Sequence, residues 1–305
     1  MTSSNPAQVH VTPIESLESR RLLSFSISKG GTLTVLGTKS NDDVVISADS
    51  QNANMLAVRV NGHTDLIPGN GIKAVYVNLG RGNDKFIFDA TFGAAKSKIA
   101  LRTVLGGEGD DSLGGSIGND SIDGQGGNDT ISGREGNDTL LGANGSDHIS
   151  GGTGADVADG GNDADFIETG EGNDSIRGGA GNDFLHGGPD QDTVRGDDGN
   201  DSLEGCNGND ALFGGTGNDV LDGLFGSDTL RGEDGNDILT GNFGNDGPDL
   251  PGDVDALFGD AGNDDFDSLD SDSEVRDRNS GDDGDNGFVP SAEGVNDVLD
   301  EREFV

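Results

Sequence analysis

The 305-residue chain contains no tryptophan, a single tyrosine and only 30% hydrophobic residues. This is too little apolar material for a conventional two-layer domain of such length. The only cysteine, Cys206, can form no internal disulfide, so cross-links do not replace the missing core. No apolar stretch is long enough for a transmembrane helix, and the first thirty residues lack the apolar run of a secretory signal. We therefore expect no membrane insertion, and export would need another route.

Positive charge is also scarce. The chain has 18 Lys and Arg against 58 Asp and Glu, which gives a formal net charge of −40. Residues 106–249 alone hold 32 acidic and 4 basic side chains. Such an acidic segment repels phosphate backbones and anionic lipid headgroups, so no nucleic acid is expected as a partner. Cations are the expected partners.

Glycine, with 55 residues, and aspartate recur in a strict order. Sixteen nine-residue windows run without a gap from Gly106 to Asp249, and each has Asp at position 6. Position 1 is Gly except at Thr169, position 4 is Gly except at Asp163 and Asp190, and position 8 is a large aliphatic residue in fourteen windows. Such phase-locked positions indicate one structural unit copied many times. The position-6 residues are Asp111, Asp120, Asp129, Asp138, Asp147, Asp156, Asp165, Asp174, Asp183, Asp192, Asp201, Asp210, Asp219, Asp228, Asp237 and Asp246.

Each window predicts a six-residue Gly-rich turn followed by three extended residues with one central aliphatic side chain. Gly tolerates positive φ, and Asn, at position 5 in ten windows, is the next most tolerant residue. Two windows would close one coil of a parallel β-roll, so the predicted fold class is all-β. Its interior would be one side chain wide. The predicted core is Leu113, Ile122, Ile131, Leu140, Ile149, Ile167, Ile176, Leu185, Val194, Leu203, Leu212, Leu221, Leu230 and Leu239.

Stacked coils would place each position-6 Asp about one strand spacing from the Asp two windows later, as for Asp111 and Asp129. Two carboxylates about 5 Å apart repel by roughly 3 kcal/mol at an effective dielectric of 20, and a hard divalent cation between them reverses the sign. Turn carbonyls supply further oxygens for Ca²⁺, whereas Mg²⁺ fits an irregular cage less well. The predicted metal ligands are the sixteen aspartates with turn carbonyls such as those of Gly107, Gly109, Gly179, Gly181, Gly215 and Gly217.

At most about fourteen calcium ions would fit in this block, because each window pairs with its next-but-one neighbour. Their charge of about +28 would balance the formal −28 of residues 106–249. The alternative is that the acidic residues form only a solvated surface. Solvation, however, does not require each Asp to stay in phase with the glycines around it. The phase therefore favours calcium binding.

Other parts of the chain differ from the repeats. Residues 26–105 predict a small β-rich cap with strands near 32–36, 44–47, 55–60, 72–79 and 98–105. Degenerate repeat units occur around Asn41-Asp42 and Asn83-Asp84. Residues 250–267 contain an interrupted last repeat, and the acidic tail 268–305 is expected to be disordered.

Two resemblances to known sequences follow. In the polar leader 1–25, the run from Glu15 to Ser24 resembles the LEPR-XLL motif near the start of many large bacterial surface proteins, with Ser19 in place of the proline. The windows Gly106–Leu113, Gly178–Leu185 and Gly214–Leu221 resemble hemolysin-type (RTX) calcium-binding repeats, over about half the chain. The second resemblance implies a right-handed parallel β-roll with calcium held by the position-6 aspartates and turn carbonyls. It also implies secretion from a Gram-negative-type cell, usually by a one-step route read from the C-terminus.

Signs of catalysis are few: the four histidines are scattered, and no His-Glu-x-x-His or Gly-x-Ser-x-Gly motif occurs in a suitable place. We therefore predict a non-enzymatic, extracellular or cell-surface protein that binds calcium and folds on binding it. One alternative is a calcium-dependent adhesion or polysaccharide-binding module that presents the cap or the roll to a cell-surface glycan or surface protein. A second is an accessory part of a secreted glycan-acting enzyme.

Overall fold

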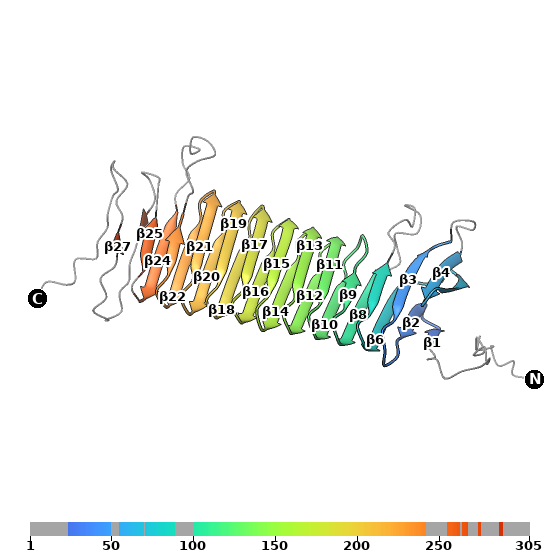
Figure 1. Ribbon diagram of the computed structural model, residues 1–305. Helices are drawn as coiled ribbons and strands as arrows, with labels where there is room; N and C mark the ends of the chain where they lie inside the picture. The colour runs from blue at the N-terminus through green and yellow to red at the C-terminus, as the bar shows by residue number, and fades with distance from the viewer. Residues whose placement is uncertain are drawn as a thin grey trace, which may run out of the picture.

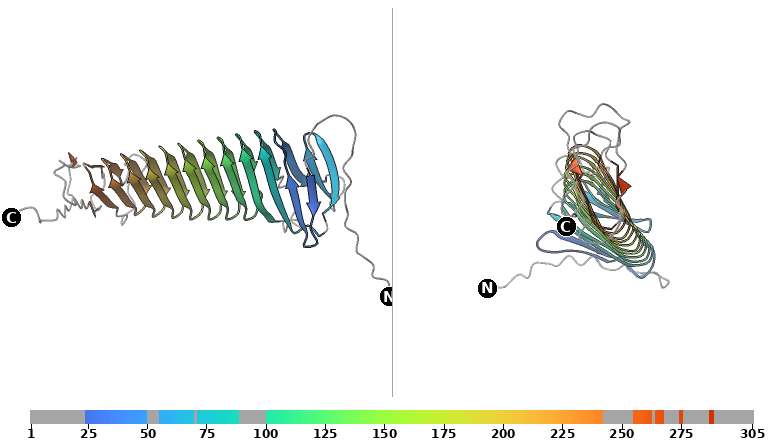
Figure 2. Two further views of the ribbon diagram at one scale, coloured as in Figure 1. Left: turned by 90° about the horizontal axis from the view of Figure 1, so that it is seen from below. Right: turned by 90° about the vertical axis from the view of Figure 1, so that its left-hand side faces the viewer.

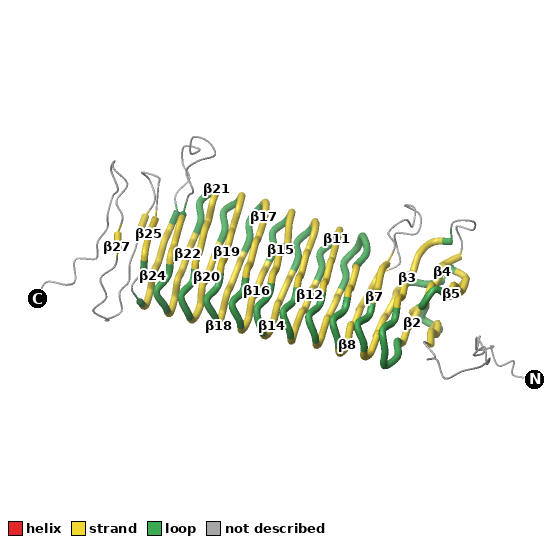
Figure 3. Tube along the Cα trace, viewed as in Figure 1, coloured by secondary structure: helices red, strands yellow, loops and turns green. Residues whose placement is uncertain are grey.

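The computed structural model describes residues 24–49, 55–69, 71–88, 100–241, 255–262, 264–267, 274–275 and 287–288. All regular secondary structure in these residues is β-strand, which Figure 3 shows in yellow. The strands are wound into one elongated, flattened coil (Figure 1), and the end-on view of Figure 2 shows the successive coils almost superimposed. No helix among the described residues is both long and apolar enough to cross a membrane.

Along the roll, consecutive strands alternate between two sheets. Sheet A contains, in spatial order, β1 (Ser24–Ile27), β2 (Thr32–Leu36), β6 (Ala74–Arg81), β8 (Ala100–Glu108), β10 (Ser121–Gly126), β12 (Thr139–Asn144), β14 (Val157–Asn162), β16 (Ser175–Ala180), β18 (Thr193–Asp198), β20 (Ala211–Thr216), β22 (Thr229–Asp234), β24 (Ala256–Ala261) and β26 (Glu274–Val275). Sheet B contains β27 (Gly287–Phe288), β25 (Asp265–Asp267), β23 (Ile238–Thr240), β21 (Val220–Phe225), β19 (Ser202–Asn207), β17 (Phe184–Pro189), β15 (Phe166–Glu171), β13 (His148–Thr153), β11 (Thr130–Glu135), β9 (Ser112–Gly114), β7 (Lys85–Phe88), β3 (Asp43–Ala48), β4 (Met55–Val60) and β5 (His63–Pro68).

One coil of the roll is 18 residues long. In sheet A, Ser121 pairs with Thr139 and Thr139 pairs with Val157, all in parallel register. The predicted parallel β-roll with two nonapeptides per coil is therefore confirmed. All fourteen predicted core residues are buried between the sheets, together with Ala158 at the one aliphatic position where the side chain is small. The core is a single continuous cluster along the roll.

Within a repeat, the strand is longer and the turn shorter than predicted. A typical strand covers six residues, from position 7 to position 3 of the next window, and only positions 4 to 6 form the turn. The expected six-residue turn was wrong because the chain stays extended through the glycine at position 1. Side chains alternate in a strand, so positions 6, 8 and 1 all face inward, as the repeated burial pattern of β11 to β14 shows.

The roll also starts earlier than residue 106. Strand β2 pairs in parallel with β6, and β6 pairs in parallel with β8, so the cap residues already form coils. Antiparallel strands close this end, because β1 pairs with β2 and the hairpins β3–β4–β5 extend sheet B. Strands β1, β5 and β7 were not predicted. Residues 1–23 of the leader lie outside the described residues, as does the tail apart from the two-residue strands β26 and β27.

A neighbouring pair of residues tests how much stability the narrow core supplies. Leu221 is fully buried, whereas Val220 beside it is 42% exposed on the outer face. Replacing Leu221 with Ala should cost about 2–5 kcal/mol through lost burial and an unfilled cavity. Val220→Ala should change stability by less than about 0.5 kcal/mol. Urea denaturation in saturating calcium measures both, and equal midpoints for the two variants would contradict the assignment of the core.

Candidate metal centre

The position-6 aspartates close the turns at both edges of the flattened coil. Each comes two residues before the core aliphatic side chain, so strand alternation directs it inward as well. From Asp111 to Asp237 every one of them has at most 4% of its surface exposed. Aspartate is rarely buried to this extent unless it is paired. Each buried carboxylate oxygen is therefore expected to have a hydrogen-bond donor or a cation as its partner.

One carboxylate oxygen, Oδ1, has a regular partner. It accepts a hydrogen bond from the backbone N–H of the aspartate one coil earlier, as in Asp111 N to Asp129 Oδ1 at 2.7 Å and Asp183 N to Asp201 Oδ1 at 2.8 Å. These bonds form two aspartate ladders, one along each edge. The first ladder is Asp42, Asp84, Asp111, Asp129, Asp147, Asp165, Asp183, Asp201, Asp219, Asp237 and Asp264. The second ladder is Asp120, Asp138, Asp156, Asp174, Asp192, Asp210, Asp228 and Asp255.

The other carboxylate oxygen, Oδ2, is the unusual one. It is buried and has no hydrogen-bond partner in Asp84, Asp111, Asp129, Asp138, Asp147, Asp156, Asp165, Asp183, Asp192, Asp201, Asp210, Asp219 and Asp237. Ionised carboxylate oxygens accept hydrogen bonds but cannot donate them. An unpaired, buried negative charge is strongly unfavourable. Each edge of the roll therefore contains a row of buried carboxylate oxygens that have no hydrogen-bond donor beside them.

Position-1 glycines make room for this oxygen. An added Cβ on Gly133 would lie 2.3 Å from Asp138 Oδ2 and 2.7 Å from the carbonyl oxygen of Gly151, which is position 1 of the next coil. The same two neighbours surround Gly196, where they belong to Asp201 and Gly214. Most larger residues would collide with the carboxylate; Thr169, the exception in the described windows, donates its hydroxyl to the Gly187 carbonyl oxygen at 3.0 Å. Position 1 is therefore Gly because the carboxylate and a backbone carbonyl converge on it from two coils.

Burial raises the pKa values of these carboxyls. The pKa of Asp129 rises from 3.8 to about 7, first because burial penalises its charged form and then because the Asp111 and Asp147 carboxylates repel it. The hydrogen bond from the Asp111 backbone opposes this shift. Asp165 and Asp192 also reach about 7, and Asp183 and Asp219 about 6, again mainly through burial. Without a cation, the ladders thus hold protons near neutral pH.

A hard divalent cation fits this donor set. The unpaired Oδ2 atoms and the position-1 carbonyls are all oxygen, the ligand type that Ca²⁺ prefers in groups of six to eight. Within the described residues, the unpaired Oδ2 atoms named above accept no hydrogen bond from any cationic side chain. The structure thus leaves oxygen ligands facing each other between successive coils. A bound calcium ion would supply the positive charge that these edges lack.

The carbonyls that the sequence predicted as ligands lie in two different parts of the coil. The carbonyl oxygens of Gly181 and Gly217 do lie in turns and face the next coil, where an added Cβ on Gly199 or Gly235 would be 1.4 Å from them. The predicted position-2 residues, Gly107, Gly179 and Gly215, lie within β8, β16 and β20 instead. Sequence reasoning missed the position-1 carbonyls, since it placed that glycine in the turn. Position 1 faces inward in the structure, and its carbonyl oxygen therefore lies near the carboxylate of the adjacent coil.

The role of asparagine at position 5 was also wrongly predicted. None of the described position-5 residues has positive φ, which occurs at positions 2 and 4 instead. The Asn side chain carbonyl accepts a hydrogen bond from the position-5 N–H of the next coil, as in Asn200 N to Asn182 Oδ1 at 2.9 Å. The aspartate ladder runs the other way, toward the preceding coil. Adjacent turns are therefore tied together by side chains in both directions.

Asp163 and Asp190 replace glycine at position 4 without disrupting their turns. They adopt left-handed φ values of 73° and 84°, like the glycines at equivalent places. Asp120 is an exception among the ladder residues, because both of its carboxylate oxygens are bonded to Ser116. Its Oδ2 is therefore not one of the unpaired oxygens.

Four ladder aspartates lie outside the sixteen predicted residues: Asp42, Asp84, Asp255 and Asp264. Asp246 lies outside the described residues, and the ladder step from Asp228 leads to Asp255 at a spacing of 27 residues. The sequence did contain a signal for this. Asp255 begins the run Asp-Ala-Leu-Phe-Gly, which repeats the run beginning at Asp210. The nine extra residues equal one whole window, so Asp255 keeps the nine-residue phase of Asp228.

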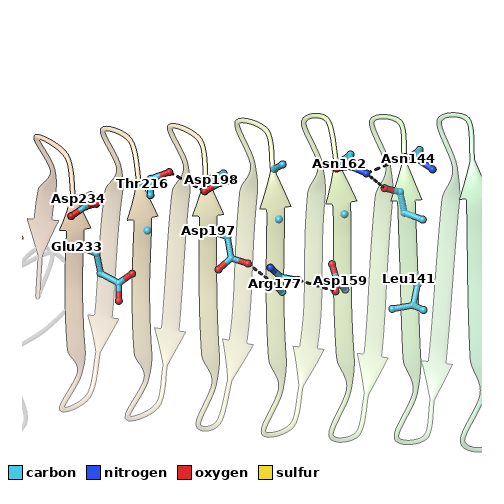
Figure 4. Close-up of a pocket in the computed structure, with 15 residues that line it drawn as sticks. Leu141, Asn144, Asp159, Asn162, Arg177, Asp197, Asp198, Thr216, Glu233 and Asp234 are labelled. Carbon is cyan, nitrogen blue, oxygen red and sulfur yellow. Dashed lines mark hydrogen bonds and ion pairs between the residues drawn. The ribbon is translucent and has the colours of Figure 1, made fainter.

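The outer face of sheet A carries a separate feature, a groove of about 850 Å³ that crosses several coils. Figure 4 shows its polar lining, in which Arg177 lies between Asp159 and Asp197 and forms ion pairs with both. The amides of Asn144 and Asn162 are hydrogen-bonded to each other at 3.0 Å. These side chains point away from the core, so the groove is distinct from the aspartate ladders.

Comparison with known proteins agrees with this geometry. The family model of the RTX calcium-binding nonapeptide repeat, four copies long, matches residues 105–140, 141–176, 159–194, 168–203, 186–221 and 213–247. Residues 105–247, a little under half of the chain, thus match RTX calcium-binding repeats, and this match indicates multiple calcium ions as the cofactor. No curated protein matches the chain. One similar solved structure is the X-ray crystal structure of a hyperactive, Ca²⁺-dependent, β-helical antifreeze protein from an Antarctic bacterium, with 23% identity, a TM-score of 0.41, and coverage of 70% of this chain and 78% of that chain.

The raised pKa values predict how the calcium-free protein responds to pH. The folded ladders bind protons more tightly than the unfolded chain, because the pKa of residues such as Asp138 rises from 3.8 to about 7. This contribution to stability is present at low pH and is lost as pH rises through about 6 to 7. Circular dichroism of calcium-free protein should show more β-structure at about pH 5.5 than at about pH 8.

The matched control is the same comparison in saturating calcium. There the carboxylates are compensated by the ion, so the signal should change little over this pH range. Equal β-sheet content of the calcium-free protein at both pH values would contradict the proposed protonation of the ladders.

Proposed function

We propose that the RTX repeats of residues 105–247 form a module that folds when calcium binds to the aspartate ladders. The ligands would be the Oδ2 atoms of the position-6 aspartates together with the position-1 carbonyls and the turn carbonyls. The observation that supports this is the row of buried, unpaired Oδ2 atoms along both edges of the roll. Calcium would bind between successive coils and so hold each coil to the next.

The energetics explain why folding should depend on the ion. The core holds essentially one aliphatic side chain per nonapeptide, so its burial contributes little against the conformational entropy of a glycine-rich chain. Buried carboxylates on both edges add desolvation and mutual repulsion. Ions that bind only the folded form stabilise it by mass action. Without calcium, the repeats should therefore be largely unfolded at neutral pH.

Calcium availability would confine the folded state to one compartment. Extracellular calcium-binding modules typically have dissociation constants of about 10⁻⁴ to 10⁻³ M. Repeats with such affinity stay unfolded in the cytoplasm and fold outside the cell. We therefore infer that the protein acts outside the cell or at its surface, where the roll serves as a rigid, non-enzymatic spacer.

A calcium titration of the full-length chain tests the folding step. Circular dichroism should show a cooperative gain of β-structure with calcium and a much weaker response to magnesium. The double substitution Asp183→Ala and Asp201→Ala removes two adjacent carboxylates of the first ladder and leaves the Asp183 amide without its acceptor. We expect it to raise the calcium midpoint at least about threefold, since cooperative coils lose a shared ion.

The control for that experiment is Asp198→Ala with Asp234→Ala. These two residues carry the same charge but are exposed at position 3, on β18 and β22 of the same sheet with β20 between them. Their removal should leave the midpoint within about a factor of two. An identical shift for both double variants would show that overall charge, and not ladder geometry, controls the response.

The groove on sheet A supports a second candidate function, the binding of a polysaccharide. Its amide, hydroxyl and carboxylate groups could hydrogen-bond to sugar hydroxyls, and a rigid roll would keep them in a line (Figure 4). Asn144→Ala with Asn162→Ala should then weaken retention on cell-envelope polysaccharide in calcium, while Ser202→Ala on sheet B should not. Equal retention of all variants would exclude this groove. Turnover of an acidic polysaccharide by the isolated chain would instead support a role in a glycan-acting enzyme.

A further inference from the structure

A cluster of different chemistry lies on the outer face of sheet B, away from the aspartate ladders. His186 on β17 and Glu204 on β19 are direct neighbours in the parallel register, and Cys206 lies two residues beyond Glu204. One ligand atom from each residue lies within 4.8 Å of the other two. All three side chains are half-buried. The cluster thus brings together imidazole, thiol and carboxylate groups from two successive coils.

The distances suit a transition metal. Cys206 Sγ lies 2.9 Å from His186 Nε2, which in turn lies 3.9 Å from Glu204 Oε2. In a tetrahedral site with Zn–S near 2.3 Å and Zn–N or Zn–O near 2.0–2.2 Å, ligand atoms are about 3.3–3.6 Å apart. Small rotations of the side chains would bring all three atoms to such distances. Calcium is excluded by the ligand type, because it prefers oxygen to sulfur and imidazole nitrogen.

The surroundings of the cluster favour a cation. Asp222 on β21 pairs in register with Glu204, and its Oδ1 is buried without a hydrogen-bond partner. His186 Nδ1 is also buried and unpaired. Glu204 and Asp222 therefore place negative charge beside the cluster, which a divalent cation would neutralise.

Cys206 stands at position 2 of its window, where the backbone is left-handed, with a φ of 86° at Cys206 and 118° at Gly188 in the neighbouring strand. Several other windows also carry a side chain at this position, among them Arg134 and Leu224, so the repeat accepts one there. Position 2 therefore presents a side chain beside the next strand, and at Cys206 this side chain meets His186.

We propose that His186, Glu204 and Cys206 form a binding site for one borderline-soft divalent cation, with Zn²⁺ the best match. On binding, the Cys206 thiol releases its proton to water and the thiolate coordinates the ion. A water molecule or Asp222 would occupy the fourth position. Because the ligands come from β17 and β19, the ion would link two successive coils on the face of sheet B. This site goes beyond calcium binding and does not depend on which residues hold calcium.

Cobalt substitution tests the proposal on the full-length, calcium-saturated protein under reducing conditions. Co²⁺ should bind with a stoichiometry of one per chain and produce a thiolate-to-cobalt charge-transfer band in the near ultraviolet. Oxygen-only binding to the ladders cannot produce this band. Added Zn²⁺ should abolish it. Cys206→Ser should remove the band, and His186→Gln should weaken Co²⁺ binding at least about tenfold.

His148→Gln is the matched control, since His148 lies on the same face of sheet B and stacks on Phe166 with ring centroids 4.7 Å apart. It should leave the cobalt band unchanged. The calcium transition in circular dichroism should be the same in all these variants, because the three ligands face away from the core and the ladders. No charge-transfer band in the folded protein, or a band that His186→Gln leaves unaltered, would overturn the proposal.

Discussion

The structure depends on a buried carboxylate in which one oxygen accepts a hydrogen bond and the other oxygen does not. In each coil, one oxygen of the position-6 aspartate accepts a hydrogen bond from the preceding coil, and this bond fixes the direction of the side chain. The other oxygen is thereby held inside the edge of the roll beside a glycine and a carbonyl oxygen. Oxygens that face each other without a donor need a cation. The same geometry that orders the stack therefore creates the requirement for the metal.

This arrangement divides the nonapeptide into inward positions with separate tasks. Position 8 supplies the apolar core, position 6 the carboxylate and position 1 the space that the carboxylate occupies. None of the three is sufficient alone, because the core is narrow and the carboxylates repel each other. Cations at the edges and aliphatic side chains in the centre would stabilise the same stack of coils. In the proposed function, folding of the roll and binding of calcium are therefore one process.

Outward-facing positions contribute neither to the core nor to the aspartate ladders, and their residue types vary along the roll. Sheet A places Arg195 over the ring of Phe213 at 4.1 Å, and sheet B carries the stacked rings of Phe166 and Phe184. Because the strand register repeats every 18 residues, each outward-facing side chain lies beside the side chain 18 residues later, in the next coil. The polar groove and the His186–Glu204–Cys206 cluster both arise in this way. A rod with a constant interior can therefore carry different sites on its faces.

The sequence by itself determined the period, the two windows in each coil, the core positions and the aspartates that line the edges. It could do so because a phase repeated sixteen times is visible without knowledge of any long-range contact. Only the tertiary structure decided what depends on stacking. That group includes the position-1 carbonyls, the hydrogen bonds of asparagine, and the ladder step from Asp228 to Asp255, which spans 27 residues instead of 18. The reason is physical: these contacts join residues 18 or 27 positions apart, and their direction depends on which face of the strand each residue occupies.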